Sequence, residues 1–250
     1  MLLSRTSGRC LLSAVILGAV QFSASFCPAQ AADEKGFVLK QFSQSVGHQT
    51  VYLTPTRLKA VSAEQGTVTV ARAPAWDIVI YSPTRKAYFQ TPLARWKGPP
   101  LHTIMMLYGL DVSSFELRKL NRHSLICGQR ATLYLPVARA SSKNTSKATG
   151  ETGITSILQG DQYNASRCHE FWCADDVAVP KEAVQILSKM YAVTAGDKVP
   201  LKLVFLENSA TKTGLQTLSC KEARLPGSDF AVPAGYKKAA RYEDLVVDLD

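Results

Sequence analysis

The segment RCHEFWCADD, residues 167–176, places two cysteines, one histidine and three carboxylates within ten residues. Side chains of these types act as zinc ligands, redox thiols and general acids or bases. Structural zinc sites, however, present Cys-x2-Cys pairs with a second pair downstream. Cys168 and Cys173 are separated by four residues, and neither a second pair nor a Cys-x-x-Cys redox motif occurs in the sequence. We therefore predict no metal site and no cofactor.

Acid–base catalysis by this segment is also disfavoured by the geometry of a strand. Neighbouring side chains of a strand point to opposite faces, so His169 diverges from Glu170 and Asp175 from Asp176. The Asp pair better suits the approach to a helix N-terminus. The sequence also lacks the motifs Gly-x-Ser-x-Gly, Gly-x4-Gly-Lys and His-Glu-x-x-His. We predict that the protein is not an enzyme.

The first 31 residues have the composition of a secretory signal peptide. Arg5 and Arg9 give a positive start, residues 11–20 form an uncharged apolar core, and residues 29–31 (Ala-Gln-Ala) have the small-x-small pattern of a cleavage site. The apolar run is shorter than the roughly 20 residues of a transmembrane helix. We predict a cleaved signal over residues 1–31 and secretion across the inner membrane, into the periplasm or, alternatively, the extracellular space.

The mature chain, residues 32–250, is long enough for one large domain or two small ones with a substantial core, and we predict a single domain. Signal removal takes away two arginines and no acid, so the formal net charge falls from +9 to +7. An exported basic protein meets anionic lipid head groups, envelope polymers and acidic proteins. This charge is compatible with peripheral membrane contact. Nucleic acid is rarely met there, and we predict no such partner.

Four cysteines remain in the mature chain, and an even number in an oxidising compartment favours two disulfides. The sequence leaves three connectivities open. The four disulfide candidates are Cys127, Cys168, Cys173 and Cys220.

The first part of the mature chain is rich in strand-forming residues. β-Branched residues over 50–54 and 67–71, separated by the turn-prone residues 64–66, predict an antiparallel meander. A β-hairpin is predicted next, because Ser82 suits the first position of a turn and Pro83 fixes φ at the second. Alternation then places one set of side chains on each face of the first hairpin strand. These sets are Trp76, Ile78 and Ile80 on one face and Asp77, Val79 and Tyr81 on the other.

The rest of the chain is predicted from shorter patterns. Residues 131–137, 169–180, 201–207 and 215–225 read as strands, with residues 208–214 as a hairpin loop. Residues 101–111 fit a short helix or a buried strand, and residues 114–122 fit helix and strand equally. The composition of residues 138–153 predicts a flexible, solvent-facing loop.

One amphipathic helix is predicted over residues 180–191. Pro180 suits its first position, and Ala183, Ile186, Leu187 and Met190 follow the i, i+3, i+4, i+7 spacing. Such a stripe is typical of ordinary core packing. The alternative is that Ile186, Leu187 and Met190 line a lid over a ligand.

The order of these elements resembles the LolA/LolB-like lipoprotein-carrier superfamily of periplasmic half-barrel proteins, which includes members of unknown function. The resemblance covers most of residues 36–236 and ends in a Phe-x-x-Pro-x-Gly-Tyr-like turn. The residues that match this turn are Phe230, Pro233, Gly235 and Tyr236. The resemblance implies a mainly β fold with few helices (α+β), in which a curved antiparallel sheet forms an unclosed barrel lidded by one or more helices.

The resemblance also implies a function. We expect a non-catalytic envelope protein that binds or carries a hydrophobic ligand, such as a lipid, a glycolipid or the acyl chains of a lipoprotein. The candidate cavity residues are Trp76, Ile78, Ile80, Leu133, Leu135, Leu203 and Phe205. Basic residues at a rim would hold an anionic head group, and the candidates are Arg85, Lys86, Arg95 and Lys97. The alternative is a secreted protein-interaction module with a filled core and no lipid cargo.

Overall fold

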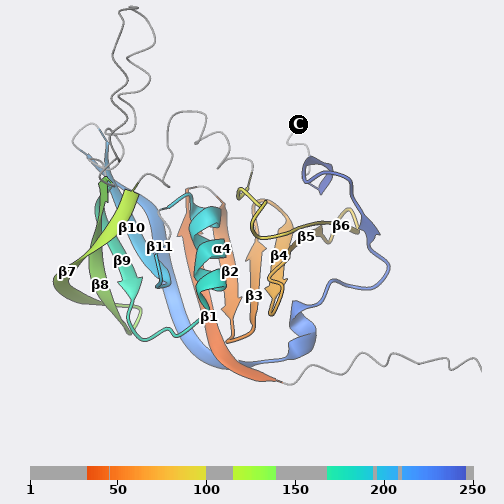
Figure 1. Cartoon of the computed structure of the whole chain (residues 1–250), viewed down its shortest axis with the longest axis horizontal. Helices are drawn as coiled ribbons and strands as arrows, with labels where there is room; N and C mark the ends of the chain where they lie inside the picture. Colours follow the sequence, from red (N-terminus) through yellow and green to blue (C-terminus); the bar gives the residue numbers. More distant parts are fainter. Residues whose placement is uncertain are drawn as a thin grey trace, which may run out of the picture.

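The computed structural model describes residues 33–44, 46–99, 115–138, 168–193, 196–207 and 210–245. These residues form one twelve-stranded sheet and one α-helix, α4 (Lys181–Tyr191) (Figure 1). The strand order is β12-β6-β5-β4-β3-β2-β1-β11-β10-β9-β8-β7, so the sheet is open. The predicted mainly β class with an unclosed sheet is confirmed at this level. Within the described residues, no helix is long and apolar enough to cross a membrane.

The strands have the following bounds. They are β1 (Glu34–Ser43), β2 (Gly47–Leu53), β3 (Arg57–Ser62), β4 (Thr67–Arg72), β5 (Ile78–Ser82), β6 (Ala87–Thr91), β7 (Phe115–Ile126), β8 (Gln129–Ala138), β9 (Cys168–Ala174), β10 (Pro200–Glu207), β11 (Ala210–Leu225) and β12 (Lys237–Lys238). Two short 3-10 helices, η2 (Gly227–Phe230) and η3 (Glu243–Leu245), follow β11 and β12. All described pairings are antiparallel except that of β12 with β6, which is parallel and departs from the prediction.

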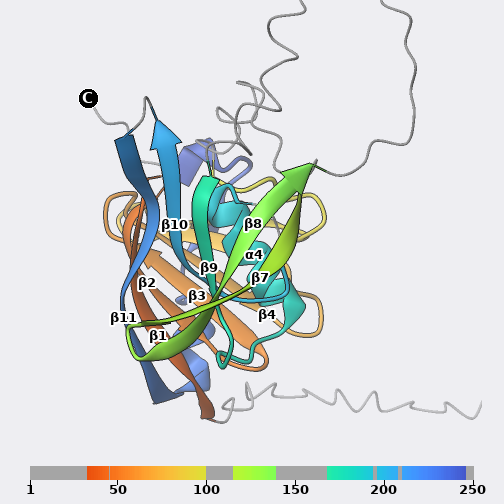
Figure 2. The same ribbon diagram turned by 90° about the vertical axis from the view of Figure 1, so that its left-hand side faces the viewer.

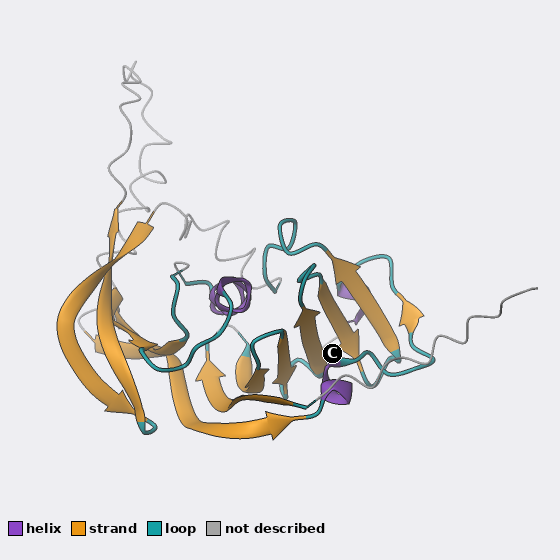
Figure 3. Ribbon diagram, turned by 60° about the horizontal axis from the view of Figure 1, so that its bottom comes forward, coloured by secondary structure: helices purple, strands orange, loops and turns teal. Residues whose placement is uncertain are grey.

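The side of the sheet that faces α4 can be followed strand by strand through the register. Ile80 lies opposite Thr69, Thr69 opposite Ala60, Ala60 opposite Val51 and Val51 opposite Leu39. Residues opposite each other in an antiparallel pair project to the same face. Figure 3 places α4 on this side, which we call the helix-facing side. It continues through β1 and β11 to β10, because Ser43 pairs with Leu215 and Leu215 with Leu203.

The opposite side of β3 to β6 carries a second, smaller apolar cluster. It contains Val68, Val70 and Tyr81, and the chain after η2 packs against it through Val232 and Tyr236. The rings of Tyr81 and Tyr236 meet edge to face, with 5.6 Å between their centroids. This cluster confirms that Val79 and Tyr81 face away from Ile78 and Ile80, as the alternation predicted. Trp76 joins the main core, although it precedes β5.

Several predicted boundaries differ from the structure. The ambiguous residues 114–122 belong to a strand, since β7 runs from Phe115 to Ile126. The predicted strand over 169–180 was too long, because β9 ends at Ala174. The predicted loop over 208–214 is largely strand, because Thr211 and Thr213 extend the ladder of β11 against β10. Residues 1–31, 101–111 and 139–153 lie outside the described residues.

Candidate functional site

Helix α4 presents one apolar stripe to the sheet. Pro180 precedes it with φ −59°, and Ala192 ends it at φ 52°, where the Val193 N–H donates to the Ser188 carbonyl over 3.0 Å. The left-handed residue at the end closes the helix in the manner of a Schellman cap. The buried residues of the helix are Ala183, Val184, Ile186, Leu187, Ser188, Met190 and Tyr191. The predicted helix and its stripe are confirmed.

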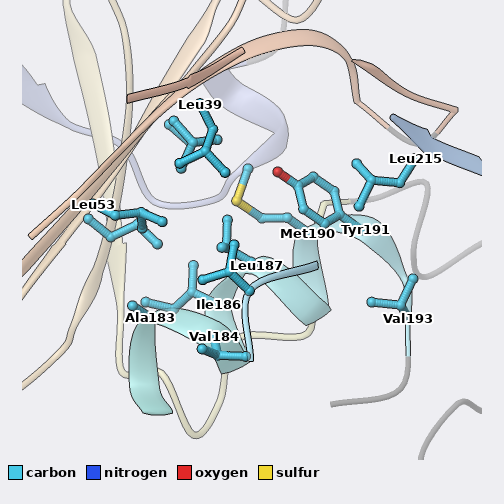
Figure 4. Packing of buried hydrophobic residues seen from close by; sticks show 14 of the residues in the cluster. Leu39, Leu53, Ala183, Val184, Ile186, Leu187, Met190, Tyr191, Val193 and Leu215 are labelled. Atoms are coloured by element: carbon cyan, nitrogen blue, oxygen red, sulfur yellow. The ribbon is translucent and has the colours of Figure 1, made fainter. Parts of the chain in front are cut away.

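The stripe packs directly on the helix-facing side of the sheet. Figure 4 shows Met190 and Leu187 pointing toward Leu39 and Leu53, which come from β1 and β2. Leu39, Leu53, Ile186 and Leu187 are all fully buried. The space between helix and sheet is therefore filled by side chains at these positions. Leu39 and Leu53 were missed as candidates, although alternation in residues 37–43 and 49–53 could have found them.

The candidate cavity residues do not share one face of the sheet. The main core contains five of them, namely Trp76, Ile78, Ile80, Leu133 and Leu203. The register places Ile80 and Leu203 on the helix-facing side. Leu133 is also buried, but it pairs with Trp172, which pairs with Lys202, the neighbour of Leu203. Leu133 and Leu135 therefore lie on the opposite face from Leu203.

The two remaining candidates are Leu135 and Phe205. Leu135 is only half-buried. Phe205 lies on β10, but its side chain lies outside what the structure describes. Trp172 and Cys173 point to opposite faces of β9, and both are buried.

A chain of hydrogen bonds crosses the apolar layer between α4 and the sheet. The Gln49 side-chain amide donates to the Tyr191 hydroxyl, which donates to the Gln41 side-chain carbonyl. The Gln41 amide donates to the Thr217 hydroxyl over 2.9 Å and to the Pro200 carbonyl over 3.0 Å. Thr217 in turn donates to the Leu201 carbonyl over 2.8 Å. This polar chain connects α4 to β1, β2, β10 and β11.

The members of the polar chain are buried, and one of its atoms has no partner. Gln41, Gln49, Tyr191 and Thr217 are each at most 5% exposed. Burial raises the pKa of Tyr191 far above its usual range, so the phenol stays neutral. The side-chain oxygen of Gln49 is buried without a hydrogen bond in the described residues. An unpaired buried acceptor costs about 1 to 3 kcal/mol of stability. The interface between α4 and the sheet therefore contains one unsatisfied hydrogen-bond acceptor.

Lys189 fastens the last turn of α4 to the loop after β6. Its ammonium donates to the carbonyls of Leu93 and Trp96 over 2.9 and 2.7 Å. Burial lowers the pKa of Lys189. Two of the predicted rim residues, Arg95 and Lys97, are exposed in this loop, next to the helix.

The other two predicted rim residues lie elsewhere. Arg85 and Lys86 are in the turn that precedes β6, whereas Arg95 and Lys97 follow it, so the length of β6 separates the two pairs. Arg85 donates to the Asp244 carbonyl over 3.2 Å, at the C-terminal segment. The four residues do not form a single rim.

Within the RCHEFWCADD segment, Asp175 follows β9 and contacts side chains of β7 and β8. The Thr132 hydroxyl donates to the Asp175 carboxylate over 2.8 Å and lies 3.0 Å from His123 Nδ1, and Arg130 Nε lies 3.3 Å from Asp175. Thr132 is fully buried, so its hydroxyl cannot reach a substrate. The described residues contain no group of three or more His, Cys, Asp and Glu that could hold a metal ion.

The predicted disulfides remain a prediction. Cys127 and Cys220 are thiols in this structure. Cys168 lies at the start of β9, and its side chain lies outside what the structure describes. The prediction followed from an even number of cysteines, which fixes neither pairing nor oxidation state.

An open cavity of about 750 Å³ lies on the far side of the sheet from α4. Its lining includes Arg72, Asp77 and Gln90, together with Phe230 at the end of η2. Arg57 lies over the Phe230 ring, 5.8 Å from its centroid, and its guanidinium is 3.1 Å from the Glu34 carboxylate. No local pattern predicted this cavity, because its walls come from strands and a C-terminal segment that are far apart in the chain. Pro233 and Gly235 are exposed beyond it.

The Glu34 carboxylate is expected to make stability depend on pH. Burial alone would raise its pKa, but hydrogen bonds from Thr54 and Thr56 and the charge of Arg57 outweigh burial, and the net shift is downward from 4.5. A lowered folded-state pKa gives stability that is present above the unfolded pKa and is lost as pH falls through the folded pKa. We expect Glu34→Gln to cost about 1.5 kcal/mol at pH 7 and less at pH 3, measured by urea unfolding. An equal cost at both pH values would contradict this assignment.

No family model matches the chain, and no curated protein matches its sequence. Among solved structures, an uncharacterized conserved protein from Thermus thermophilus is similar, with 10% identity, a TM-score of 0.41, and coverage of 82% of this chain and 90% of that one. PNGF-II is similar with 10% identity and a TM-score of 0.43 over 86% of this chain. This chain spans 32% of the length of PNGF-II.

Proposed function

We propose that the protein is an exported, non-catalytic envelope protein that binds a hydrophobic ligand, with acyl chains held on the helix-facing side of the sheet. In this proposal α4 is a displaceable lid over a curved sheet of the LolA/LolB-like kind. The observation that carries it is the packing of one amphipathic helix on the helix-facing side of the sheet, which combines an apolar core with buried polar residues, through an interface that leaves the Gln49 oxygen unpaired.

The apolar stripe of α4 could be exchanged for a ligand of the same character, because burial of the ligand would offset exposure of the stripe. An acyl chain that replaces the α4 stripe would bury apolar surface at about 0.8 kcal/mol per methylene. The stripe withdrawn from the sheet includes Ile186, Leu187 and Met190. A hydroxyl or amide of the ligand would also satisfy Gln49. In this proposal Arg95 and Lys97, which are exposed in the loop that Lys189 contacts, would hold an anionic head group.

The alternative is a protein-interaction module with a filled core. One observation favours it, because the stripe of α4 fills the space above Leu39 and Leu53. Such a module also needs an exposed apolar patch of several hundred Å². Among the described residues, the large exposed hydrophobic side chains are Leu125 and Leu218.

Ligand binding is tested by lipid extraction and native mass spectrometry of the protein purified from an envelope fraction. We expect a co-purifying acyl lipid and rebinding of fatty acids after its removal. Brominated fatty acids quench tryptophans that they contact, so the Trp172→Phe variant, which keeps Trp76 and Trp96 in the core beside α4, should be quenched. An apo mass together with no quenching would reject the ligand-binding proposal in favour of the interaction module.

A further inference from the structure

The turn between β7 and β8 carries a cysteine at an unusual backbone position. Cys127 and Gly128 both have positive φ, 50° and 78°. This is the pattern of a type I′ hairpin turn, in which Asn, Asp or Gly is preferred at the first position. Cys127 is exposed, so its thiol is accessible to reagents in solution.

The same turn reaches across to β11, three strands away in the sheet order (Figure 2). The Cys127 thiol donates to the Thr217 carbonyl, with 3.1 Å between sulfur and oxygen. The contact is possible because β9 ends at Ala174 and β10 begins at Pro200, with Lys202 opposite Gln216. The β7–β8 turn thus meets the part of β11 that extends past the β10 ladder.

A second thiol lies on that part of β11. Cys220 pairs with Leu39 and is 8% exposed. Lys40 pairs with Ser219 but Gln41 pairs with Thr217, so Leu218 is an extra, bulged residue of β11. Because of this bulge, Thr217 and Cys220 face the same side of the sheet although they are three positions apart. Burial, and in second place the neighbouring Cys127 thiol, raises the pKa of Cys220 to about 11. Both thiols therefore lie at the same stretch of β11, since Cys127 contacts the Thr217 carbonyl and Cys220 is three positions further along the strand.

We propose that Cys127 and Cys220 form a reversible disulfide that clips the β7–β8 turn to β11. The geometry that supports it is the sulfur contact at Thr217 together with the shared side of Thr217 and Cys220. The proposal does not depend on the proposed function.

The chemistry is thiol–disulfide exchange with a small or protein disulfide as oxidant. The exposed Cys127 thiolate attacks one sulfur of the oxidant and releases the other as a thiolate. The Cys220 thiolate then attacks the Cys127 sulfur of the mixed disulfide and releases the second thiolate. Two protein thiols are oxidised, and one disulfide is reduced to two thiols, which take up the two protons.

The other two cysteines of the mature chain cannot complete a second bridge with each other. Cys168 and Cys173 lie on the continuous strand β9, five positions apart, which corresponds to roughly 16 Å between their Cα atoms. A disulfide requires Cα atoms within about 7 Å. A Cys127–Cys220 bridge is therefore not accompanied by a bridge between Cys168 and Cys173.

The bridge would change the mechanics of one end of the sheet. Strands β8, β9, β10 and β11 are joined by backbone ladders, and the clip would join the β7–β8 turn back to β11. The oxidised form would then hold this part of the sheet as a ring. In the reduced form, the β7–β8 turn contacts β11 through the hydrogen bond from the Cys127 thiol to the Thr217 carbonyl.

Peptide mapping tests the pairing. The exported protein is blocked with N-ethylmaleimide, digested with trypsin without reduction, and analysed by mass spectrometry; a second sample is reduced and then treated with oxidised glutathione at pH 8.5. Trypsin releases Cys127 in residues 123–130, Cys220 in residues 213–221, and both Cys168 and Cys173 in residues 168–181. We expect the first two peptides to be linked in the glutathione-treated sample. The melting temperature of that form should rise on the order of 10 °C above that of the reduced form.

Two variants make the outcome specific. Cys127→Ser should abolish both the linked peptides and the redox-dependent melting temperature, whereas Cys173→Ser should keep both. Glutathione that remains on Cys127 as a stable mixed disulfide would overturn the proposal, because the resolving thiol would then be out of reach. A link from residues 168–181 to either other peptide would overturn it as well.

Discussion

Tyr191→Phe is expected to lower the free energy of unfolding by about 2 to 4 kcal/mol. The substitution removes one oxygen and leaves the Gln49 amide without its acceptor and the Gln41 carbonyl without its donor. Each unsatisfied buried group costs about 1 to 3 kcal/mol, and both residues are at most 4% exposed. Chemical denaturation at pH 7 measures the difference in the free energy of unfolding, with the same dependence on denaturant concentration (m value) used for both proteins.

The control for this experiment is Tyr52→Phe. Tyr52 is on β2, like Gln49, but it faces away from α4 and is half-buried. We expect a change within about 0.5 kcal/mol. Equal effects of the two tyrosine variants would show that the hydroxyl of Tyr191 has no special role.

A double-mutant cycle locates the effect in the polar chain. Gln49→Leu removes the amide N–H that donates to the Tyr191 hydroxyl, and it also removes the unpaired side-chain oxygen. We therefore expect Gln49→Leu to lower the free energy of unfolding by less than Tyr191→Phe does. In the Tyr191→Phe background the Gln49 substitution should be neutral or stabilising, because the amide has already lost its acceptor. Additive effects would mean that the two side chains are not coupled.

Leu187→Ala is expected to cost about 2 to 5 kcal/mol and, under the proposed function, to increase the uptake of a fluorescent fatty acid. Leu187 is fully buried in the α4 stripe, and its truncation leaves a void between helix and sheet. A weakened helix contact would raise the population of the displaced helix. Equilibrium unfolding measures the first effect, and fluorescence titration well below the melting temperature measures the second.

Phe230→Ala separates loss of stability from opening of the site. Phe230 is also fully buried, but it packs on the other side of the sheet, beneath Arg57. Its truncation should cost about 3 to 5 kcal/mol and leave fatty-acid uptake unchanged. If both variants increase uptake equally, the probe reports partial unfolding, and the lid role of α4 is rejected.

The elements that could be predicted from the sequence are those set by neighbouring residues. The hairpin around Pro83 follows from turn chemistry, and α4 follows from the spacing of Ile186, Leu187 and Met190. The alternation of Ile78, Val79 and Ile80 correctly separated the two faces of β5.

The parts that could not be predicted depend on partners distant in the chain. Gln41 and Tyr191 are 150 positions apart, and no local pattern indicates that a glutamine on β1 meets a helix residue. Leu133 and Leu203 were grouped because both lie on apolar strands, but their faces are decided by the register across β9. The cysteine count left the pairing of the cysteines open because it contains no information on distance.

The pairing of β1 with β11 has a consequence for the order in which the sheet can form. Glu34 lies opposite Leu225, so the middle of the sheet joins the two ends of the described chain. Synthesis proceeds from the N-terminus, so β11, which pairs with β1 on the side opposite β2, is made only after most of the chain. Such long-range contacts slow folding, because the loop has to close before the contacts stabilise it. The hairpins from β1 to β6 can assemble early, and β1 then remains an uncovered edge until β11 arrives.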